Sequence, residues 1–328
     1  METYRPVAQR LMQVRRSFAW RVALKGLVFL GQFLFLLLMI RAESRAQLCT
    51  GEPLRVDEAV GWLHARSHPT TTQDRTELGI VIVKERVSGI AEVQVDVDTG
   101  GHVIGVTPIS GPRQLISAYR DEAKETTFYP FQRDGQPVCA RFTLKYAAAL
   151  GHADGPDAKT KEKFVPLFNQ CSALSATKSE PEALHECQLA AEEADKLVAL
   201  ANNRNRVAAY TYYASALILA NRPKEALAYA DKAVAICDLG FVDVSDKATA
   251  YSLRGEARAL TGDAHGASED LAKAEELGRA MLEVPRTPEQ RKYDSGVLRS
   301  TLIFHAQILA GSGNAAEAEK LRDEARRL

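Results

Sequence analysis

The chain has 328 residues and carries 42 Lys and Arg against 42 Asp and Glu, so its formal net charge at pH 7 is zero. This length is sufficient for two domains. The even balance hides a split, because residues 1–46 hold eight Lys and Arg but only two Asp and Glu, and the other 282 residues carry a net charge of −6. A mildly acidic body argues against a nucleic-acid-binding protein.

The first 46 residues predict export across a membrane. Six basic residues lie within the first 25 positions and precede an apolar run from Leu27 to Ile40. The run has the length of a secretory signal and is shorter than the roughly 20 residues that a spanning helix prefers. Ser44 and Ala46 supply small residues for cleavage before Gln47, while an uncleaved inner-membrane anchor at residues 22–40 stays open. We therefore expect the body of the chain in the periplasm or cell envelope.

The chain has five cysteines, and cysteines in an oxidising compartment form disulfides. Cys171 and Cys187 are the first candidate pair, because a helical hairpin that turns near residues 178–179 would place them opposite each other. Two buried thiols are the alternative at these positions. Cys49 with Cys139 is a second candidate bridge. The odd count leaves at least one cysteine unpaired within a monomer.

Residues 50–147 show the periodicities of a small α/β domain. Apolar residues three and four apart predict a helix that stops at Pro69, and the alternation of valines with polar residues after Ile90 predicts a strand with one buried face. The segment Phe128–Val138 seals the end of the core with aromatic residues and then reverses the chain. The predicted elements are a helix at Val56–His68, a strand at Gly79–Val87, a hairpin with arms at Ile90–Val97 and His102–Val106, a helix from Pro112 to Glu125, and a strand at Val138–Tyr146.

Several segments of this domain, taken in order, resemble one known family. They are "SGIAEVQVDVDTGGHVIGVTPISG", "TFYP", "DGQPV" and the alternating terminal strand, and over about residues 75–147 they look like the C-terminal domain of TonB-family energy transducers. The resemblance implies that the edge of the strand at Val138–Tyr146 binds an extended partner segment by β-augmentation. An edge covered by the helices that follow is the alternative. The implied partner-binding residues are Val138, Ala140, Arg141, Phe142, Thr143 and Leu144.

A Gly-, Pro- and Asp-rich linker at residues 148–162 leads into a helical half at residues 163–328. There a large residue, a small one four positions later and two further small ones recur in register from Leu167, Tyr210, Tyr251 and Leu302, which resembles tetratricopeptide (TPR) repeats. About four such hairpins stack into a short solenoid, and TPR arrays bind peptides or partner domains in a concave groove. The candidate groove residues are Asn205, Arg206, Tyr212, Tyr213, Arg254 and Arg258.

Sequence motifs for catalysis or metal binding are missing. The chain has no GxSxG, HExxH, Walker or CxxC motif. His64 and His68 have the spacing of two metal ligands on one helical face, but Pro69 ends that helix and no third ligand follows. Alternation places Asp96 and Asp98 on the wet face of a strand. We therefore expect no enzyme activity, no metal and no cofactor.

The sequence thus predicts an α+β chain with an N-terminal export or anchor helix, a small TonB-C-like α/β domain and an all-α TPR-like solenoid. The favoured function is a cell-envelope interaction module, in which strand addition captures one partner segment and the solenoid recruits a second protein or peptide. The alternatives are an assembly scaffold without strand-edge binding, a TonB-type energy transducer for outer-membrane transport, and a hydrolase with its site between the domains.

Overall fold

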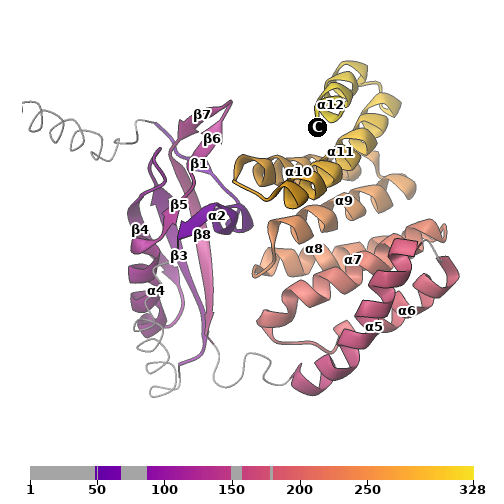
Figure 1. Cartoon of the computed structure of the whole chain (residues 1–328), viewed down its shortest axis with the longest axis horizontal. Coiled ribbons are helices and arrows are strands. Elements are labelled where there is room, and N and C mark those ends of the chain that lie inside the picture. Colours follow the sequence, from indigo (N-terminus) through magenta and orange to yellow (C-terminus); the bar gives the residue numbers. More distant parts are fainter. Residues whose placement is uncertain (1–48, 50, 68–86, 149–156, 178–179) are drawn as a thin grey trace, which may run out of the picture. The chain divides into compact units, whose positions relative to one another are not determined.

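The computed structural model describes residues 49, 51–67, 87–148, 157–177 and 180–328 (Figure 1). The predicted export segment, nearly all of the predicted strand at Gly79–Val87 and most of the predicted linker lie outside these residues. Within the described ranges, no helix combines the length and the hydropathy that crossing a bilayer requires.

The first half of the chain is built on a four-stranded sheet with the strand order β1-β8-β3-β4. Its strands are β1 (Leu54–Arg55), β3 (Gly89–Val97), β4 (Val103–Ser110) and β8 (Ala140–Ala148). β3 is antiparallel to β4 and β8, while β1 runs parallel to β8. The predicted hairpin and the predicted terminal strand therefore form most of this sheet.

The terminal strand does not occupy the outer edge that the resemblance implies. β8 pairs with β3 along its whole length and with β1 at Ala140 and Arg141. The sequence gives no sign of β1, because a strand of two residues has no periodicity to detect. In the described part of the sheet, the outermost strands are β1 and β4.

One face of the sheet carries the hydrophobic core, and helices α2 (Glu58–His64) and α4 (Arg113–Glu125) pack against it. The alternating valines of β3 are fully buried there, together with Leu144 of β8. α2 lies very close to the sheet at Gly61, where a Cβ atom would be 2.5 Å from the ring of Phe142. Glycine at this position is therefore what allows α2 to reach the core.

Two short strand pairs complete this half. The helix predicted at Val56–His68 ends at His64 and is followed by β2 (Ala65–Ser67), which pairs with β5 (Thr127–Phe128). β6 (Phe131–Arg133) and β7 (Gln136–Val138) form a hairpin. Its turn residues, Asp134 and Gly135, both have positive φ, as a type I′ turn requires. Phe128 and Phe131 are buried, so the aromatic segment closes the core as the sequence predicts.

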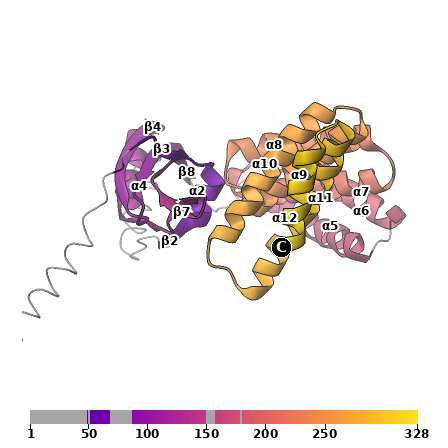
Figure 2. The ribbon, with the colours of Figure 1, turned by 90° about the horizontal axis from the view of Figure 1, so that it is seen from above.

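The second half is helical from Ala158, five residues before the predicted start. The buried carboxylate of Asp157 fixes this start, because it accepts hydrogen bonds from the backbone N–H groups of Val198 (2.9 Å) and Ala199 (2.7 Å). Consecutive helices pair into four antiparallel hairpins, α5–α6 to α11–α12, as the TPR-like pattern predicts (Figures 1 and 2). Their bounds are α5 (Ala158–Thr177), α6 (Glu180–Ala194), α7 (Asn203–Leu219), α8 (Pro223–Leu239), α9 (Val244–Leu260), α10 (Ala264–Glu283), α11 (Pro288–Gly311) and α12 (Ala315–Arg327).

Disulfides join both of the cysteine pairs that the sequence suggests. Cys49 bonds to Cys139, the residue before β8, and Cys171 on α5 bonds to Cys187 on α6. Cys237 is free and buried, and burial raises the pKa of its thiol to about 12. A thiol with this pKa stays protonated at neutral pH, so Cys237 acts as a small apolar residue of the core.

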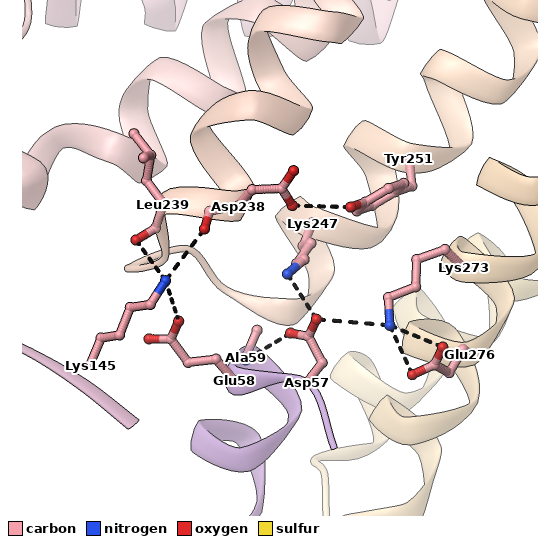
Figure 3. A network of polar contacts seen from close by, with 10 residues as sticks. All are labelled: Asp57, Glu58, Ala59, Lys145, Asp238, Leu239, Lys247, Tyr251, Lys273 and Glu276. Carbon is pink, nitrogen blue, oxygen red and sulfur yellow. Dashed lines mark hydrogen bonds and ion pairs between the residues drawn. The ribbon is translucent and has the colours of Figure 1, made fainter. Parts of the chain in front are cut away.

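Helix α2 connects the two halves through a network of polar contacts (Figure 3). The carboxylate of Asp57 caps α2 by accepting from the N–H of Ala59 (3.0 Å), and its other oxygen lies 2.9 Å from Nζ of Lys247 on α9. Nζ of Lys145 on β8 lies 3.5 Å from Glu58 and donates to the carbonyl of Leu239 at the end of α8 (3.3 Å). The hydrophobic core also continues from α2 and the sheet to residues of α9 and α10.

Replacing Gly61 with alanine tests the close approach of α2 to the sheet. We expect Gly61→Ala to lower the free energy of unfolding by about 2 kcal/mol, because the Phe142 ring must leave its packed position. Urea unfolding followed by circular dichroism measures this difference. Gly311→Ala is the matched control, since Gly311 is also helical and has nothing within 4 Å of its Cβ position. Gly311→Ala should leave the free energy of unfolding unchanged or raise it by up to about 1 kcal/mol. Equal losses of stability in both variants would contradict the close approach of α2 to the sheet.

The buried pair of Asp57 and Lys247 predicts a pH dependence of stability. Burial alone would raise the pKa of Asp57, but the hydrogen bond and the charge of Lys247 outweigh it and hold that pKa below its usual value. A lowered pKa stabilises the fold above the unfolded value of about 3.9 and ceases to do so as the pH falls through the folded value. Asp57→Asn keeps a capping side chain but leaves Lys247 unpaired, so it should cost about 3 kcal/mol at pH 7.

The cost of Asp57→Asn should begin to shrink as the pH falls below about 4 and should be smallest below the lowered folded pKa of Asp57, where the wild-type carboxylate is protonated and no longer pairs with Lys247. Thermal unfolding of both proteins between pH 7 and pH 2 measures this. A stability difference that is the same at pH 7 and pH 2 would show that the ion pair does not set it.

Candidate functional site

A cavity lies along the first helices of the second, third and fourth hairpins. Its volume is about 820 Å³, and α7, α9 and α11 form its walls and floor. We call this cavity the groove. Its apolar surface comes from small or medium side chains and from two tyrosine rings, Tyr212 on α7 and Tyr293 on α11. Its hydroxyl-bearing residues are Thr211, Ser215, Thr249, Ser252, Ser300 and Thr301.

Most of these hydroxyl groups bond back to their own helices. Thr211 donates to the carbonyl of Ala208 (2.9 Å), Thr249 to that of Ser245 (2.8 Å), and Ser300 and Thr301 bond in the same way within α11. A hydroxyl has one donor and two acceptor lone pairs, so back-bonding uses the donor and leaves acceptor capacity. Thr211 and Thr301 are buried, whereas Thr249 and Ser300 are at least partly exposed, so these two offer acceptors on the floor of the groove to the N–H groups of a ligand.

The two tyrosines of the groove come from different helices, Tyr212 from α7 and Tyr293 from α11. The hydroxyl of Tyr212 accepts a hydrogen bond from Ser172 (3.2 Å), which fixes the ring in place. Tyr293 is 62% exposed and is the most open aromatic residue at the site. Partial burial raises the pKa of Tyr293, and the nearby Tyr212 and Asp246 raise it further. Tyr212, Asp246 and Tyr293 all line the groove.

One arginine serves two carboxylates at the edge of the groove. Arg204 on α7 lies 3.1 Å from Asp246 and 3.0 Å from Asp243, so the three groups together carry one net negative charge. Burial raises the pKa of Asp246; Arg204 opposes this shift and Asp243 adds to it. The carboxylate that lines the groove is therefore poorly compensated by its own protein.

A second cavity of about 590 Å³ adjoins the groove and is bordered by both halves of the chain. Glu289 and Tyr293 line both cavities. Trp62 and Leu63 contribute the α2 side of this second cavity. Helix α2 thus provides an end wall beside the groove.

The six candidate groove residues fall into different environments. Tyr212 lines the groove, whereas Tyr213 is buried and packs edge-on against Tyr229 with 4.6 Å between ring centroids. Arg254 and Arg258 both bind the buried carboxylate of Asp270 on α10, at 2.6 and 2.9 Å. They join the two helices of one hairpin instead of facing a ligand. Asn205 and Arg206 also lie outside the lining of the groove, and Asn205 donates to Asn202.

The six candidate strand-edge residues divide between the core and the polar face. Ala140, Phe142 and Leu144 are buried against α2 and α4. Arg141 binds Asp96, the residue opposite it on β3, with 2.6 Å between Nε and Oδ1. Thr143 is partly exposed, and Val138 belongs to β7 instead of β8.

Asp98 does not lie on the wet face where alternation places it. It is 2% exposed, and its carboxylate accepts from the backbone N–H groups of Gly100 and His102, both at 2.9 Å. The strand ends at Val97, so the period of two no longer applies to the next residue. Asp98 therefore orders the turn between β3 and β4.

Ser268, His305 and Glu275 form a hydrogen-bonded chain between α10 and α11. The distances are 2.8 Å from Ser268 Oγ to His305 Nε2 and 2.6 Å from His305 Nδ1 to Glu275 Oε1. This order of groups is that of a hydrolase triad. However, Ser268 lies within α10, where backbone N–H groups bond to the preceding turn and leave no donors for an oxyanion hole. The geometry favours a buried polar contact between neighbouring hairpins.

His64 is fully buried and contacts the aromatic core. Its Nδ1 donates to the carbonyl of Tyr129 (3.1 Å), and its ring stacks on Phe131 with 4.2 Å between centroids. Burial lowers its pKa, and Nε2 lies 4.0 Å from Glu283 on α10. His68 lies outside the described residues, and among those described no three His, Cys, Asp or Glu residues are arranged to hold a metal ion.

Neither a protein family model nor a curated protein matches the chain. Among solved structures it is similar to the apo form of RapI, with 17% identity over 50% of this chain and 55% of that one and a TM-score of 0.42. MamA has 16% identity over 50% of this chain and 90% of that one, with a TM-score of 0.27. A Podosopora anserina protein described as a kinesin light chain with nearly identical TPR-like repeats has 15% identity, the same share of this chain, 93% of its own and a TM-score of 0.31.

These similarities cover helical repeats and are too low to transfer an activity or a partner. The chain spans just over half the length of RapI. The TPR-like nature of residues 158–327 rests on the four hairpins themselves, and TPR-like hairpins are a framework for protein interaction.

Arg254 should matter for stability and not for the groove. Its side chain is 18% exposed and that of Asp270 is 4% exposed, so Arg254→Ala should lower the free energy of unfolding by about 2–3 kcal/mol. Arg322→Ala, at an exposed ion pair of α12, should change it by no more than about 0.5 kcal/mol. Urea unfolding distinguishes the two, and a loss of ligand binding by a folded Arg254→Ala protein would place Arg254 in the groove after all.

Proposed function

We propose that this protein is an exported scaffold of the cell envelope that binds an extended segment of a partner protein in the groove. The observation that carries the proposal is the 820 Å³ cavity on α7, α9 and α11, with hydroxyl acceptors on its floor and an exposed tyrosine at its wall. An extended chain presents N–H groups that helices and sheets do not, and such groups match free acceptors. Tyr293 then acts as an aromatic anchor, as tyrosines do at interfaces.

The envelope location is part of the same proposal. Two disulfides in a chain of this length support an oxidising compartment, because cytosolic thiols are kept reduced. The basic start and the apolar run of the sequence support export, either as a cleaved signal or as an anchor at residues 22–40. The proposed partners are proteins or peptides that reach the same compartment.

Strand addition to β8, which the resemblance to the TonB C-terminal domain implies, is a second candidate for how the protein binds a partner. It is supported by the shortness of β1, which pairs only with Ala140 and Arg141. From Thr143 to Ala148, the described part of the sheet has no strand on that side of β8. The carbonyl of Arg141 accepts from Val56 on the β1 side, so alternation directs the N–H groups of Thr143, Lys145 and Ala147 to this side as well.

Peptide selection tests the groove. A phage-displayed library of random 12-residue peptides is selected on the full-length protein, and the affinities of the enriched peptides are measured by fluorescence anisotropy. Tyr293→Ala should weaken binding by about 30-fold, which corresponds to a typical hot-spot loss of 2 kcal/mol. Leu219→Ala is the matched control, because Leu219 is 61% exposed on α7 but does not line the groove. It should change affinity by less than about twofold.

Hydrogen exchange with bound peptide separates the two candidates. Strand addition would slow exchange at the amides of Thr143, Lys145 and Ala147, whereas groove binding would leave them unchanged. If the peptides bind Tyr293→Ala as tightly as the wild type and slow exchange in β8, the edge of β8 and not the groove is the binding site.

A further inference from the structure

We propose that Asp246 is the centre of a cation subsite in the groove, and that the partner segment places a lysine or arginine side chain there. The inference rests on the proposed function, since it names one chemical requirement for the same occupant. The proposal is more specific than an attraction of cations to an acidic protein, because it assigns the contact to a single carboxylate on α9.

The position of Asp246 follows from the order of the three helices. α9 packs against α7 and against α11, so it lies in the middle of the groove. Asp246 lies in the first turn of α9 and lines the cavity, with Tyr212 and Tyr293 contributed by the flanking helices. Tyrosine rings attract cations through their electron-rich faces, and a carboxylate beside them adds a full opposite charge. The two kinds of group favour the same ligand.

The charges around Asp246 leave it in need of a further cation. Arg204 is divided between Asp246 and Asp243, and its side chain is 64% exposed. Lys292 and Glu289 also line the groove, and their opposite charges sum to zero, so Asp246 leaves the lining with one net negative charge. Burial raises the pKa of Asp246, and the charge of Arg204 offsets this shift only in part. A lysine or arginine of the partner would supply the missing charge.

The rest of the groove fits a basic, extended segment. The hydroxyl acceptors of the floor pair with backbone N–H groups, and the residues after position 46 carry a net charge of −6 that attracts cationic ligands from a distance. An acidic segment would meet two carboxylates, Asp246 and Glu289, against a single lysine of the lining, Lys292. The occupant is therefore a segment with at least one Lys or Arg among small or apolar residues.

The test uses the peptides selected on the full-length protein. Lys or Arg should be enriched at one fixed position in the peptides that lose affinity for Tyr293→Ala. Asp246→Asn should weaken these peptides by about tenfold, as expected for a charged hydrogen bond. Asp323→Asn is the matched control, because it makes the same change at an exposed aspartate of α12 that does not line the groove and does not contact Arg204. It should change affinity by less than about twofold.

Replacing the enriched Lys with norleucine makes the test a double-mutant cycle. The norleucine peptide should bind the wild type and Asp246→Asn equally, because the cation that senses the carboxylate is gone. Circular dichroism melting curves confirm that each variant is folded. Equal losses for Asp246→Asn and Asp323→Asn, or a norleucine peptide that binds as tightly as the lysine peptide, would overturn the cation subsite.

The peptide results separate the cation subsite at Asp246 from the groove itself. Peptides that depend on Tyr293 but show no preference for Lys or Arg overturn the cation subsite and leave the groove as the binding site. A selection without any peptide that depends on Tyr293 overturns both.

Discussion

The contact of α2 with α9 and α10 is the interaction on which the connection between the two halves depends. Asp57 uses one oxygen to cap α2 and the other to bind Lys247, so a single carboxylate holds the helix and its neighbour together. Both charged groups are nearly buried, and a low dielectric strengthens such a pair while making the loss of one member expensive. The hydrophobic core runs through the same contact, from Ala59 and Val60 to Leu277 and Met281. Side-chain packing, and not only the chain between the halves, therefore links the sheet to the repeats.

The helices of the repeats divide their roles between stability and recognition. Second helices carry groups such as Asp270 and Glu275, which bind cations and histidine from first helices and hold the stack together. The faces of α7, α9 and α11 that remain after this packing carry serines, threonines and small residues, with one tyrosine each from α7 and α11. The groove is thus the surface that the stacking of hairpins leaves unfilled. Its composition differs from that of the core because it faces water instead of another helix.

The sequence predicts well the elements that bury one regular face. The valines of β3, the alternation of β8 and the anchors at Tyr210 and Tyr251 all follow from periodic burial, and a strand or a hairpin results in each case. β1 escapes prediction because its two residues gain their place from pairing with β8. Asp98 is misplaced because the period of two stops where the turn begins.

The groove is only partly visible in the sequence, for a geometric reason. Thr211 and Ser252 each follow the first large residue of their repeat, Tyr210 or Tyr251, by one position, and both line the groove. Arg254 follows its anchor by three residues, and this rotation of about 300° along the helix turns it toward α10. Tyr212 could be named as a groove residue, but Asp246 and Tyr293 could not, because the lengths of the loops before α9 and α11 depart from those of a regular repeat.

The disulfide in the first hairpin makes the two ends of the repeat array unequal. Cys171 and Cys187 lock α5 to α6, whereas α12 packs on α11 without a covalent bond. Local opening therefore costs less free energy in the α11–α12 hairpin than in the α5–α6 hairpin, which the disulfide holds closed. A ligand that contacts α7, α9 and α11 together would raise the free energy needed to open the α11–α12 hairpin. Binding in the groove would then stabilise the hairpin that has no disulfide of its own.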